Sequence, residues 1–254
     1  MHWKQLRILI ALTALLLSAC GVPPTAVTPP SPAPLWVSYS PYLAGIQEAL
    51  HACAVETPQL ALFFEQIPGA QQDFEDPDLV IWWGEVPPQT KFAYPLNEDE
   101  LVLIVNPGNP KQELSPTELV SLFTGRIESW TEIGIHDQPV KVWIFPEDNL
   151  LSESFQDGIL AGQRITRLAS LAPSSQAMLE SVAGDPGAIG FLPRSWLTAG
   201  VKAIEIEPAQ QVSVRKPLLA LTQAEPHGDL EALIACLQSG PGQVILSGSY
   251  DPSQ

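Results

Sequence analysis

The chain has 254 residues and is 45% hydrophobic, so it is long enough to build one large core or two modest ones. Acidic residues outnumber basic residues by 28 to 12, which gives a formal net charge of −16 at pH 7. A surface of this sign repels nucleic acids and anionic lipid headgroups, so we expect no nucleic acid partner.

The first twenty residues have the pattern of an export signal that ends in a lipidation site. Residues 1–7 are basic without an acidic residue, and residues 8–17 form a nearly continuous apolar run. A membrane-spanning helix needs about 20 apolar residues, so this run fits the shorter hydrophobic region of a signal peptide over residues 1–19. It ends in Leu-Ser-Ala-Cys, which resembles the lipobox of bacterial lipoproteins, so we expect acylation of Cys20, for example with palmitate. An ordinary cleaved signal with a chance cysteine is the alternative.

The next stretch is rich in proline. Six prolines lie between residues 21 and 34, among threonine, serine, alanine and valine. Such a stretch favours extended polyproline II, and at about 3.1 Å per residue it would hold a domain about 40 Å from the membrane. We therefore interpret residues 20–34 as a lipidated tether, and we expect an extracytoplasmic protein that its lipid anchors to the cell membrane.

Two cysteines remain once Cys20 is assigned to the lipid. Export places Cys53 and Cys236 in an oxidising compartment, where two leftover thiols pair more often than they stay free. We therefore predict a disulfide between them. Two buried, unpaired thiols are the alternative, because free cysteine packs as a small hydrophobic residue.

The folded part begins at Leu35, and its first half is dominated by short apolar runs. Strands are predicted at residues 35–38, 61–64, 79–83 and 101–105. A helix is predicted over residues 41–53, with Ser40 as its N-cap. The apolar runs are continuous, not alternating, which favours strands that are covered on both faces, as in a parallel sheet between helices.

The second half contains the clearest helix start in the chain. Ser115 can cap a helix whose first position is Pro116 and whose third is Glu118, and Gly125 marks its end. Strands are further predicted at 140–145 and 188–192, and helices at 154–161, 176–183, 229–238 and 243–246. This alternation of strands and helices predicts an α/β fold with largely parallel sheets.

Three of these segments are similar to segments of one protein family. Residues 114–134 combine the capped helix with Phe-Thr-Gly-Arg-Ile and a following Trp. Residues 101–110 form a strand that ends in an Asn-Pro turn, and residues 181–193 contain Pro-Gly-Ala-Ile-Gly. In this order and at this spacing, the segments resemble the PstS-like phosphate-binding periplasmic proteins, and the resemblance covers about residues 100–205.

The resemblance implies a fold, a division into lobes and a function. The fold would be that of a type II periplasmic binding protein, with two lobes joined by two hinge crossings and a mainly parallel sheet flanked by helices in each. Lobe 1 would combine residues 35–103 with 206–254, and lobe 2 would be residues 104–205. Cys53 and Cys236 would then share one lobe, which also favours the disulfide. The function would be that of a monomeric solute-binding subunit whose partners are a small ligand and an ABC permease.

The expected ligand site lies at the strand ends. In open α/β sheets, ligands bind beyond the carboxyl ends of strands, often at helix N-termini. The residues that follow the predicted strands, and that we expect to bind ligand, are Ser38, Tyr39, Ser40, Trp83, Glu85, Asp148, Asn149, Ser152 and Arg194.

The resemblance fails at the residues that would bind phosphate. The family's Ser-Gly-Thr falls on residues 149–151, which read Asn-Leu-Leu, and Glu147 and Asp148 stand where an arginine would precede it. Two carboxylates beside a buried dianion cost several kcal/mol unless they are paired or protonated. Phosphate therefore does not follow, and another oxyanion, a neutral or cationic solute, or no ligand at all remain open. Arg194 is the cation that could compensate.

No catalytic or metal-binding motif is present, so we expect no enzyme, no metal site and no cofactor. The favoured function is a solute-binding lipoprotein of an ABC importer with a degraded phosphate loop. A sensor or scaffold lipoprotein on the same fold, without a role in transport, is the alternative. A hydrolase is the least favoured hypothesis.

Overall fold

The computed structural model describes residues 33–57, 60–67, 73–135, 137–207 and 214–250. The predicted signal peptide, Cys20 and nearly all of the predicted tether lie outside these residues. No helix of the described part is long and apolar enough to cross a membrane.

Ten strands of the described residues form one sheet, in the order β2-β1-β3-β10-β4-β8-β6-β7, with β9 on β4 and β5 on β9. The strands are β1 (Ala33–Tyr39), β2 (Leu60–Gln66), β3 (Leu79–Trp83), β4 (Phe92–Val105), β5 (Glu113–Leu114), β6 (Lys141–Ile144), β7 (Ser170–Leu171), β8 (Ala188–Pro193), β9 (Lys202–Ile206) and β10 (Val214–Thr222). The strand prediction at 79–83 is confirmed residue for residue. The prediction at 101–105 covers only the end of β4, because the polar residues 97–100 separate this end from the first part of the strand.

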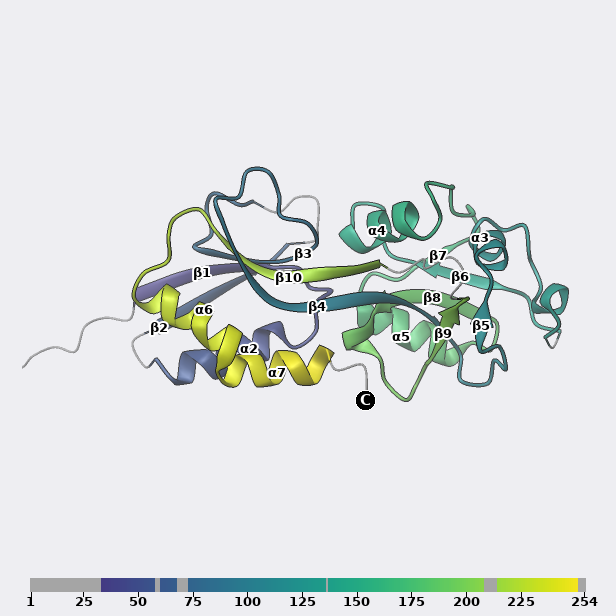
Figure 1. The fold of residues 1–254 in the computed structure, drawn as a ribbon. Coiled ribbons are helices and arrows are strands. Elements are labelled where there is room, and N and C mark those ends of the chain that lie inside the picture. Colours follow the sequence, from purple (N-terminus) through teal and green to yellow (C-terminus); the bar gives the residue numbers. More distant parts are fainter. Residues whose placement is uncertain (1–32, 58–59, 68–72, 136, 208–213, 251–254) are drawn as a thin grey trace, which may run out of the picture. The chain divides into compact units, whose positions relative to one another are not determined.

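The sheet consists of two parallel sets that β4 and β10 connect (Figure 1). β1 is parallel to β2 and β3, and β6 is parallel to β7 and β8. Every antiparallel pair of these strands includes β4 or β10. β4 pairs with β10 up to Leu101 and with β8 from Leu101 onward, so the strand passes from one set to the other at this residue.

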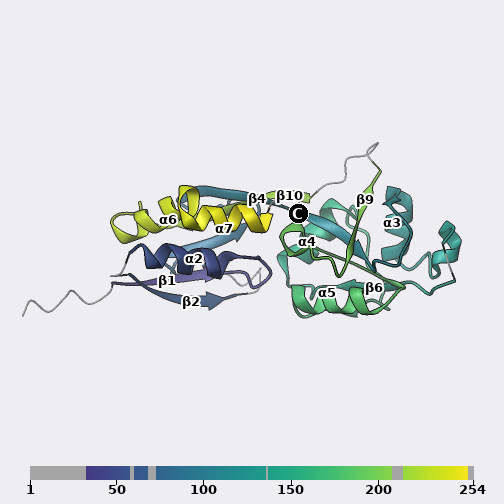
Figure 2. The ribbon, with the colours of Figure 1, turned by 90° about the horizontal axis from the view of Figure 1, so that it is seen from below.

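Helices cover both parallel sets. They are α2 (Ile46–Val55), α3 (Pro116–Phe123), α4 (Leu150–Gly158), α5 (Ser175–Gly184), α6 (Asp229–Ser239) and α7 (Pro241–Tyr250), with short 3-10 helices η2 (Trp130–Ile133) and η3 (Arg194–Trp196). α2, α6 and α7 pack together, with α2 on β2 and with α6 and α7 on β4, whereas α5 packs on β8 (Figure 2).

Two predicted helix starts are wrong. α2 begins at Ile46, not at residue 41, because Gly45 has a left-handed backbone (φ 70°) and residues 40–43 form a turn. Ser40 is therefore not its N-cap. α4 begins at Leu150, four residues before the predicted start, because the side chain of Asn149 accepts a hydrogen bond from Leu151 N and caps the helix.

The segments that resemble the phosphate-binding family form the framework of the β6–β8 set. The capping box predicted for Ser115 and Glu118 is present. Trp130 is fully buried, and its indole N–H donates to the carbonyl of Gly187 at 2.9 Å. A Cβ atom on Gly187 would lie 2.2 Å from the carbonyl oxygen of Pro139, so only glycine fits there. These residues serve the core.

The predicted disulfide between Cys53 and Cys236 is present in the structure, and it links α2 to α6 across 183 residues of sequence. A cross-link over so long a loop restricts the unfolded chain strongly. Replacing both cysteines by alanine should lower the free energy of unfolding by about 2–5 kcal/mol, measured by denaturant titration of Cys20→Ala protein.

The double variant also supplies the control for this prediction. A reducing agent should lower the melting temperature of the disulfide-bonded protein and leave that of the variant unchanged. An equal response of both proteins would contradict a structural role for the disulfide.

Candidate functional site

A groove of about 780 Å³ lies between the loop that follows β3, the side of α4 and the start of β10. The aromatic, charged and hydroxyl side chains that line it are Phe74, Trp82, Trp83, Glu85, Glu153, Ser154, Asp157, Arg215 and Lys216. Of the expected ligand-binding residues, Trp83 and Glu85 thus lie in the groove. Its residue Val214 pairs with Leu101, so the groove lies close to the point where β4 passes from one strand set to the other.

Lys216 connects the walls of the groove. Its ammonium group donates to the hydroxyl of Ser154 on α4 at 3.1 Å and lies 5.6 Å from the centre of the Trp83 ring, within the range of a cation–π contact. The indole N–H of Trp83 donates in turn to the backbone carbonyl of Asp99 at 3.3 Å. The orientation of Trp83 is therefore fixed from both sides.

The groove carries more unpaired negative than positive charge. Glu85, Glu153 and Asp157 are exposed, and none of them forms an ion pair within the described part of the chain. Arg215 is already paired with Glu100, at 3.4 Å. Such a groove repels an inorganic dianion, and its indole surfaces suit an apolar or cationic solute.

The hydroxyls expected to bind ligand mostly bond within the chain. The hydroxyl of Tyr39 accepts from Gln66 and donates to Gln47. That of Ser40 accepts from the backbone of the turn, and that of Ser152 donates to the carbonyl of Phe145. Ser38 is buried and borders a separate hollow beside Trp36. The structure does not gather these hydroxyls around one free site.

Tyr42, which the sequence analysis did not single out, links the two strand sets. It lies in the turn between β1 and α2, and its ring packs edge-on against Phe145 with the ring centres 5.2 Å apart. Its hydroxyl donates to the carbonyl of Pro173 at 3.5 Å, and its own carbonyl accepts from the indole N–H of Trp196 at 2.6 Å. Burial raises the pKa of Tyr42, and the charge of Asp148 raises it further, whereas a hydrogen bond with the Asn149 side chain lowers it. Asp148 and Asn149 thus lie beside Tyr42.

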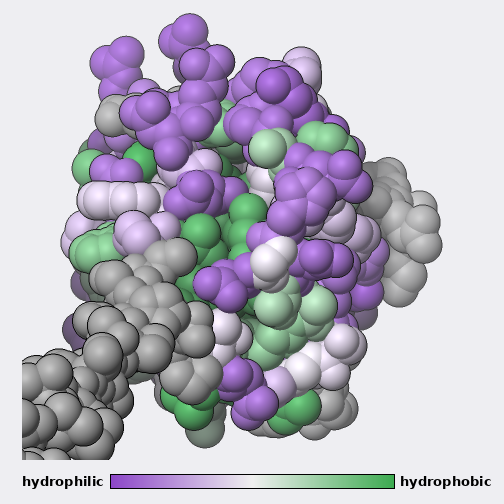
Figure 3. All heavy atoms as spheres, turned by 90° about the vertical axis from the view of Figure 1, so that its left-hand side faces the viewer, coloured by the Kyte–Doolittle hydropathy of each residue, from purple (hydrophilic) through white to green (hydrophobic). Residues whose placement is uncertain are grey.

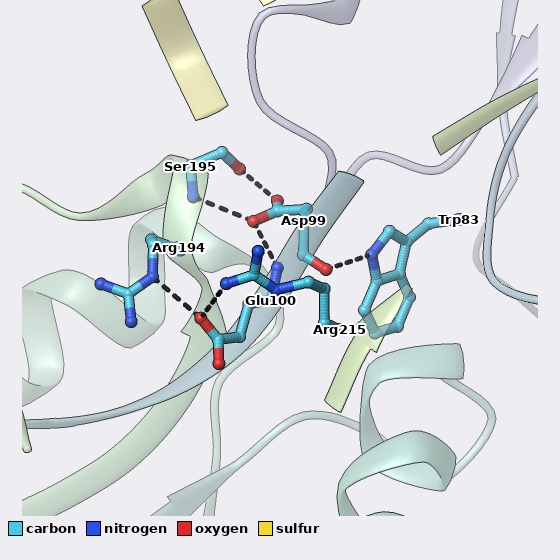
Figure 4. Close-up of polar contacts among 6 residues, drawn as sticks. All are labelled: Trp83, Asp99, Glu100, Arg194, Ser195 and Arg215. Atoms are coloured by element: carbon cyan, nitrogen blue, oxygen red, sulfur yellow. Dashed lines mark hydrogen bonds and ion pairs between the residues drawn. The ribbon is translucent and has the colours of Figure 1, made fainter. Parts of the chain in front are cut away.

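Arg194 contributes to a polar cluster at the crossing of β4 (Figure 4). Its Nε donates to Glu100 at 3.2 Å, and Arg215 donates to the same carboxylate oxygen. The neighbouring Asp99 carboxylate accepts from the hydroxyl of Ser195 at 2.7 Å and from the Glu100 amide at 2.8 Å. Arg194 is therefore engaged in joining η3 to β4, and it does not point at the carboxylates of the groove.

Burial raises the pKa of Asp99 to about 6, although the hydrogen bonds from Ser195 and Glu100 and the charge of Arg194 act to lower it. The folded protein therefore holds this proton more tightly than the unfolded chain does. The stability that Asp99 contributes is fully present below its ordinary pKa of 3.8 and is lost as the pH rises through about 6.

Asp99→Asn should remove this dependence, because the amide does not titrate. The unfolding free energy of the variant minus that of the wild type should therefore rise by about 2 kcal/mol from pH 4.5 to pH 7.5, measured by denaturant titration at both pH values. Asp157→Asn, a change at an exposed carboxylate, should follow the wild type. A stability difference between the wild type and Asp99→Asn that is the same at both pH values would contradict the assignment.

Comparison with known families gives the fold a name. A family model described as the PBP superfamily domain matches residues 89–243, more than half of the chain. The chain belongs to the PBP superfamily.

Individual relatives of this PBP-superfamily chain include phosphate-binding proteins. It is 34% identical over 98 residues to the phosphate-binding protein PstS of Bacillus subtilis, a match that covers 37% of this chain and 31% of that protein. The match therefore spans about a third of the curated relative.

Solved structures share the fold at low identity. A phosphate ABC transporter substrate-binding protein with bound phosphate, from Clostridium perfringens, superposes with a TM-score of 0.75 at 19% identity, over 86% of this chain and 98% of that one. An ABC-type phosphate transport receptor from Vibrio cholerae gives 0.66 at 20% identity, over 85% and 98%. The regulatory domain of MetR, a LysR family regulator from N. meningitidis, gives 0.59 at 16% identity, over 82% and 93%.

These findings confirm the expected type II periplasmic-binding-protein fold and the resemblance to phosphate-binding proteins. The family is one of substrate-binding proteins and is extracytoplasmic. In the residues that the structure describes, no three His, Cys, Asp or Glu side chains are grouped so that they could hold a metal ion.

Several lining residues escaped the sequence analysis. Glu153 and Asp157 lie one helical turn apart, a spacing that becomes informative only when α4 is known to begin at Leu150. Lys216 lies near the start of β10, a strand that the sequence analysis did not predict although residues 218–221 form an apolar run.

Proposed function

We propose that this protein is the solute-binding lipoprotein subunit of an ABC importer, and that it binds a small solute in the groove between α4 and the loop after β3. The groove itself carries the proposal, since its walls come from β3 and β10 on one side and from α4, the helix that follows β6, on the other. In the proposed division, residues 35–103 with 206–254 form one lobe and residues 104–205 form the other. Ligand would close the lobes about the crossings, and an ABC permease would bind the closed form.

The ligand that we propose for the groove is an organic solute, not phosphate. The unpaired carboxylates of Glu85, Glu153 and Asp157 oppose a dianion, and Lys216 is engaged by Ser154 and the face of Trp83. An apolar or ring-bearing body would pack on Trp82 and Trp83.

Native mass spectrometry of the purified mature protein, incubated with a small-molecule extract of the source cells, tests the proposal. We expect one bound small solute, because the volume of the groove lies within the range of about 300–1,000 Å³ that is typical of small-molecule pockets. Lys216→Met should reduce its occupancy about tenfold or more, because the variant removes the cation that orders Trp83 and Ser154.

Lys141→Met is the matched control, because Lys141 pairs with Asp185 and neither residue lines the groove. This variant should bind like the wild type. Absence of any bound solute from the wild-type protein, in extracts from several growth conditions, would contradict the proposal.

We propose that Cys20 carries the lipid anchor. The expected signal peptide, the lipobox and the proline-rich stretch support this proposal. Cys20→Ala should move the protein from the membrane to the soluble fraction and abolish incorporation of labelled palmitate. Unchanged membrane association of the variant would count against lipidation.

A second candidate is a sensor or scaffold lipoprotein that acts through protein contacts. Trp36 and Phe63 are about half exposed and stack with ring centres 5.1 Å apart on β1 and on the edge strand β2. Figure 3 views the molecule from the end of β1, β2 and α6, where hydrophobic side chains gather between hydrophilic ones. Cross-linking in intact cells separates the candidates: a permease supports transport, and an envelope or receptor complex supports the second function.

A further inference from the structure

The exposed cations that no carboxylate neutralises gather mostly on one surface. Within the described residues, the exposed lysines and arginines that form no ion pair are Lys91, Arg126, Arg164 and Arg167. Arg126 donates to Gln163 Oε1 at 3.3 Å, and Gln163 directly precedes Arg164, so three of these four cations come from neighbouring segments. They form a local positive surface on a chain whose net charge is −16.

Two exposed leucines border these arginines. Leu168 is 83% exposed and Leu171 is 59% exposed, and Leu171 lies on β7, the last strand in the order of the sheet. One exposed leucine alone is ordinary, whereas arginine beside exposed apolar side chains is typical of protein interfaces. We define the arginine–leucine surface as Arg126, Arg164, Arg167, Leu168 and Leu171.

This surface contains two adjoining hollows of different character. Arg164, Arg167 and Leu171 line a hollow of about 830 Å³ between α4 and the loop that leads to β7. Leu168 borders a smaller hollow of about 220 Å³, whose other lining side chains are mostly apolar. Thr166 borders both hollows. The larger hollow therefore offers guanidinium groups to an anion, and the smaller one offers room for a single apolar side chain.

The loop that carries the surface is held in place by backbone hydrogen bonds. The amide of Thr166 donates to the carbonyl of Phe123 at 2.8 Å, and that of Gly162 donates to the carbonyl of Gln156 at 2.9 Å. Ala161 has a φ of 51°, which residues other than glycine rarely adopt. Because the loop is already ordered, a partner that binds it loses little free energy to ordering the chain.

We infer that the arginine–leucine surface is a docking site for an acidic segment of a partner protein, and that this segment also carries an apolar side chain. Guanidinium groups bind carboxylates through two parallel hydrogen bonds, which gives such a contact both strength and orientation. The inference goes beyond solute binding, because no residue of the surface lines the groove between α4 and the loop after β3.

An anionic bilayer would also attract arginines, but it fits this surface less well. The larger hollow is also lined by Glu147, Glu153 and Asp157. A bilayer carries its negative charge over a wide area and would approach these carboxylates together with the arginines. A narrow polypeptide segment can place its carboxylates on the arginines alone.

Photo-cross-linking in intact cells tests the inference, with a benzophenone amino acid in place of Leu168. We expect one cross-linked partner protein, and peptide mapping should place the cross-link in a segment that has a net negative charge and an apolar residue. A synthetic peptide of that segment, titrated by fluorescence anisotropy against the purified Cys20→Ala protein, then gives the affinity.

The double variant Arg164→Glu/Arg167→Glu should bind this peptide at least about tenfold more weakly, and about 500 mM salt should weaken the binding of the unsubstituted surface to a similar extent. A peptide whose acidic residues are replaced by lysine should bind the double variant and not the unsubstituted surface. Both arginines are exposed, so the melting temperature should be unchanged.

Lys91→Glu is the matched control for the single variant Arg167→Glu. Both changes reverse the charge of one exposed, unpaired cation, but Lys91 lies outside the arginine–leucine surface. Lys91→Glu should bind the peptide like the unsubstituted protein, whereas Arg167→Glu should bind it more weakly.

The remaining outcomes count against the inference. It is overturned by a captured segment without net negative charge, by a peptide affinity that the double variant leaves unchanged, or by the absence of a cross-link under several growth conditions. Capture of a second copy of this chain would assign the surface to self-association. Arginine-dependent sedimentation of Cys20→Ala protein with phosphatidylglycerol vesicles, without a protein cross-link, would assign it to the membrane. Solute binding by the double variant, measured by native mass spectrometry, should stay intact, so a failure here leaves the proposed function standing.

Discussion

The structure depends on β4 running unbroken from one parallel strand set into the other. Nine of its first ten residues pair with β10, with a register shift at Leu96, and its last five pair with β8, so Leu101 belongs to both ladders. Because one strand serves both sets, whatever lies between them is positioned by a continuous hydrogen-bonded backbone and not by a flexible loop. The groove, the Asp99 cluster and the turn that carries Tyr42 all lie around this crossing.

The charges at the crossing follow from the composition of the chain. An acidic protein with few cations places two of them, Arg194 and Arg215, on the single carboxylate of Glu100, where η3, β4 and β10 meet. The cost is that these arginines are unavailable to a ligand. This gives a physical reason why a scaffold shared with phosphate-binding proteins need not bind phosphate. The two arginines hold η3 and β10 to β4 through Glu100, and the carboxylates of Glu85, Glu153 and Asp157 remain unpaired in the groove.

The sequence predicted those features that depend on local chemistry. The capping box of Ser115 and Glu118 and the strand at residues 79–83 require only neighbouring residues, and the cysteine pair follows from export. The start of β4 was missed because the polar residues 97–100 resemble a loop, and only their pairing with β10 makes them a strand. Tyr42 was missed because its partners, Phe145 and Pro173, lie more than a hundred residues away. Glu153 and Asp157 were missed as one acidic face of α4 because the helix was predicted to begin at residue 154, four residues after its actual start.

The pairing of Val105 with Lys202 means that the chain leaves the crossing and returns to it at adjacent positions on neighbouring strands. Residues 106–201 therefore form one continuous segment whose two ends lie on neighbouring, paired strands. The ladder between β4 and β10 lies wholly outside this stretch, whereas β8, inside it, pairs with the last five residues of β4. In such a scaffold, substitutions in the loops of residues 106–201 can change which ligand is bound while the strand pairing of the other half is kept.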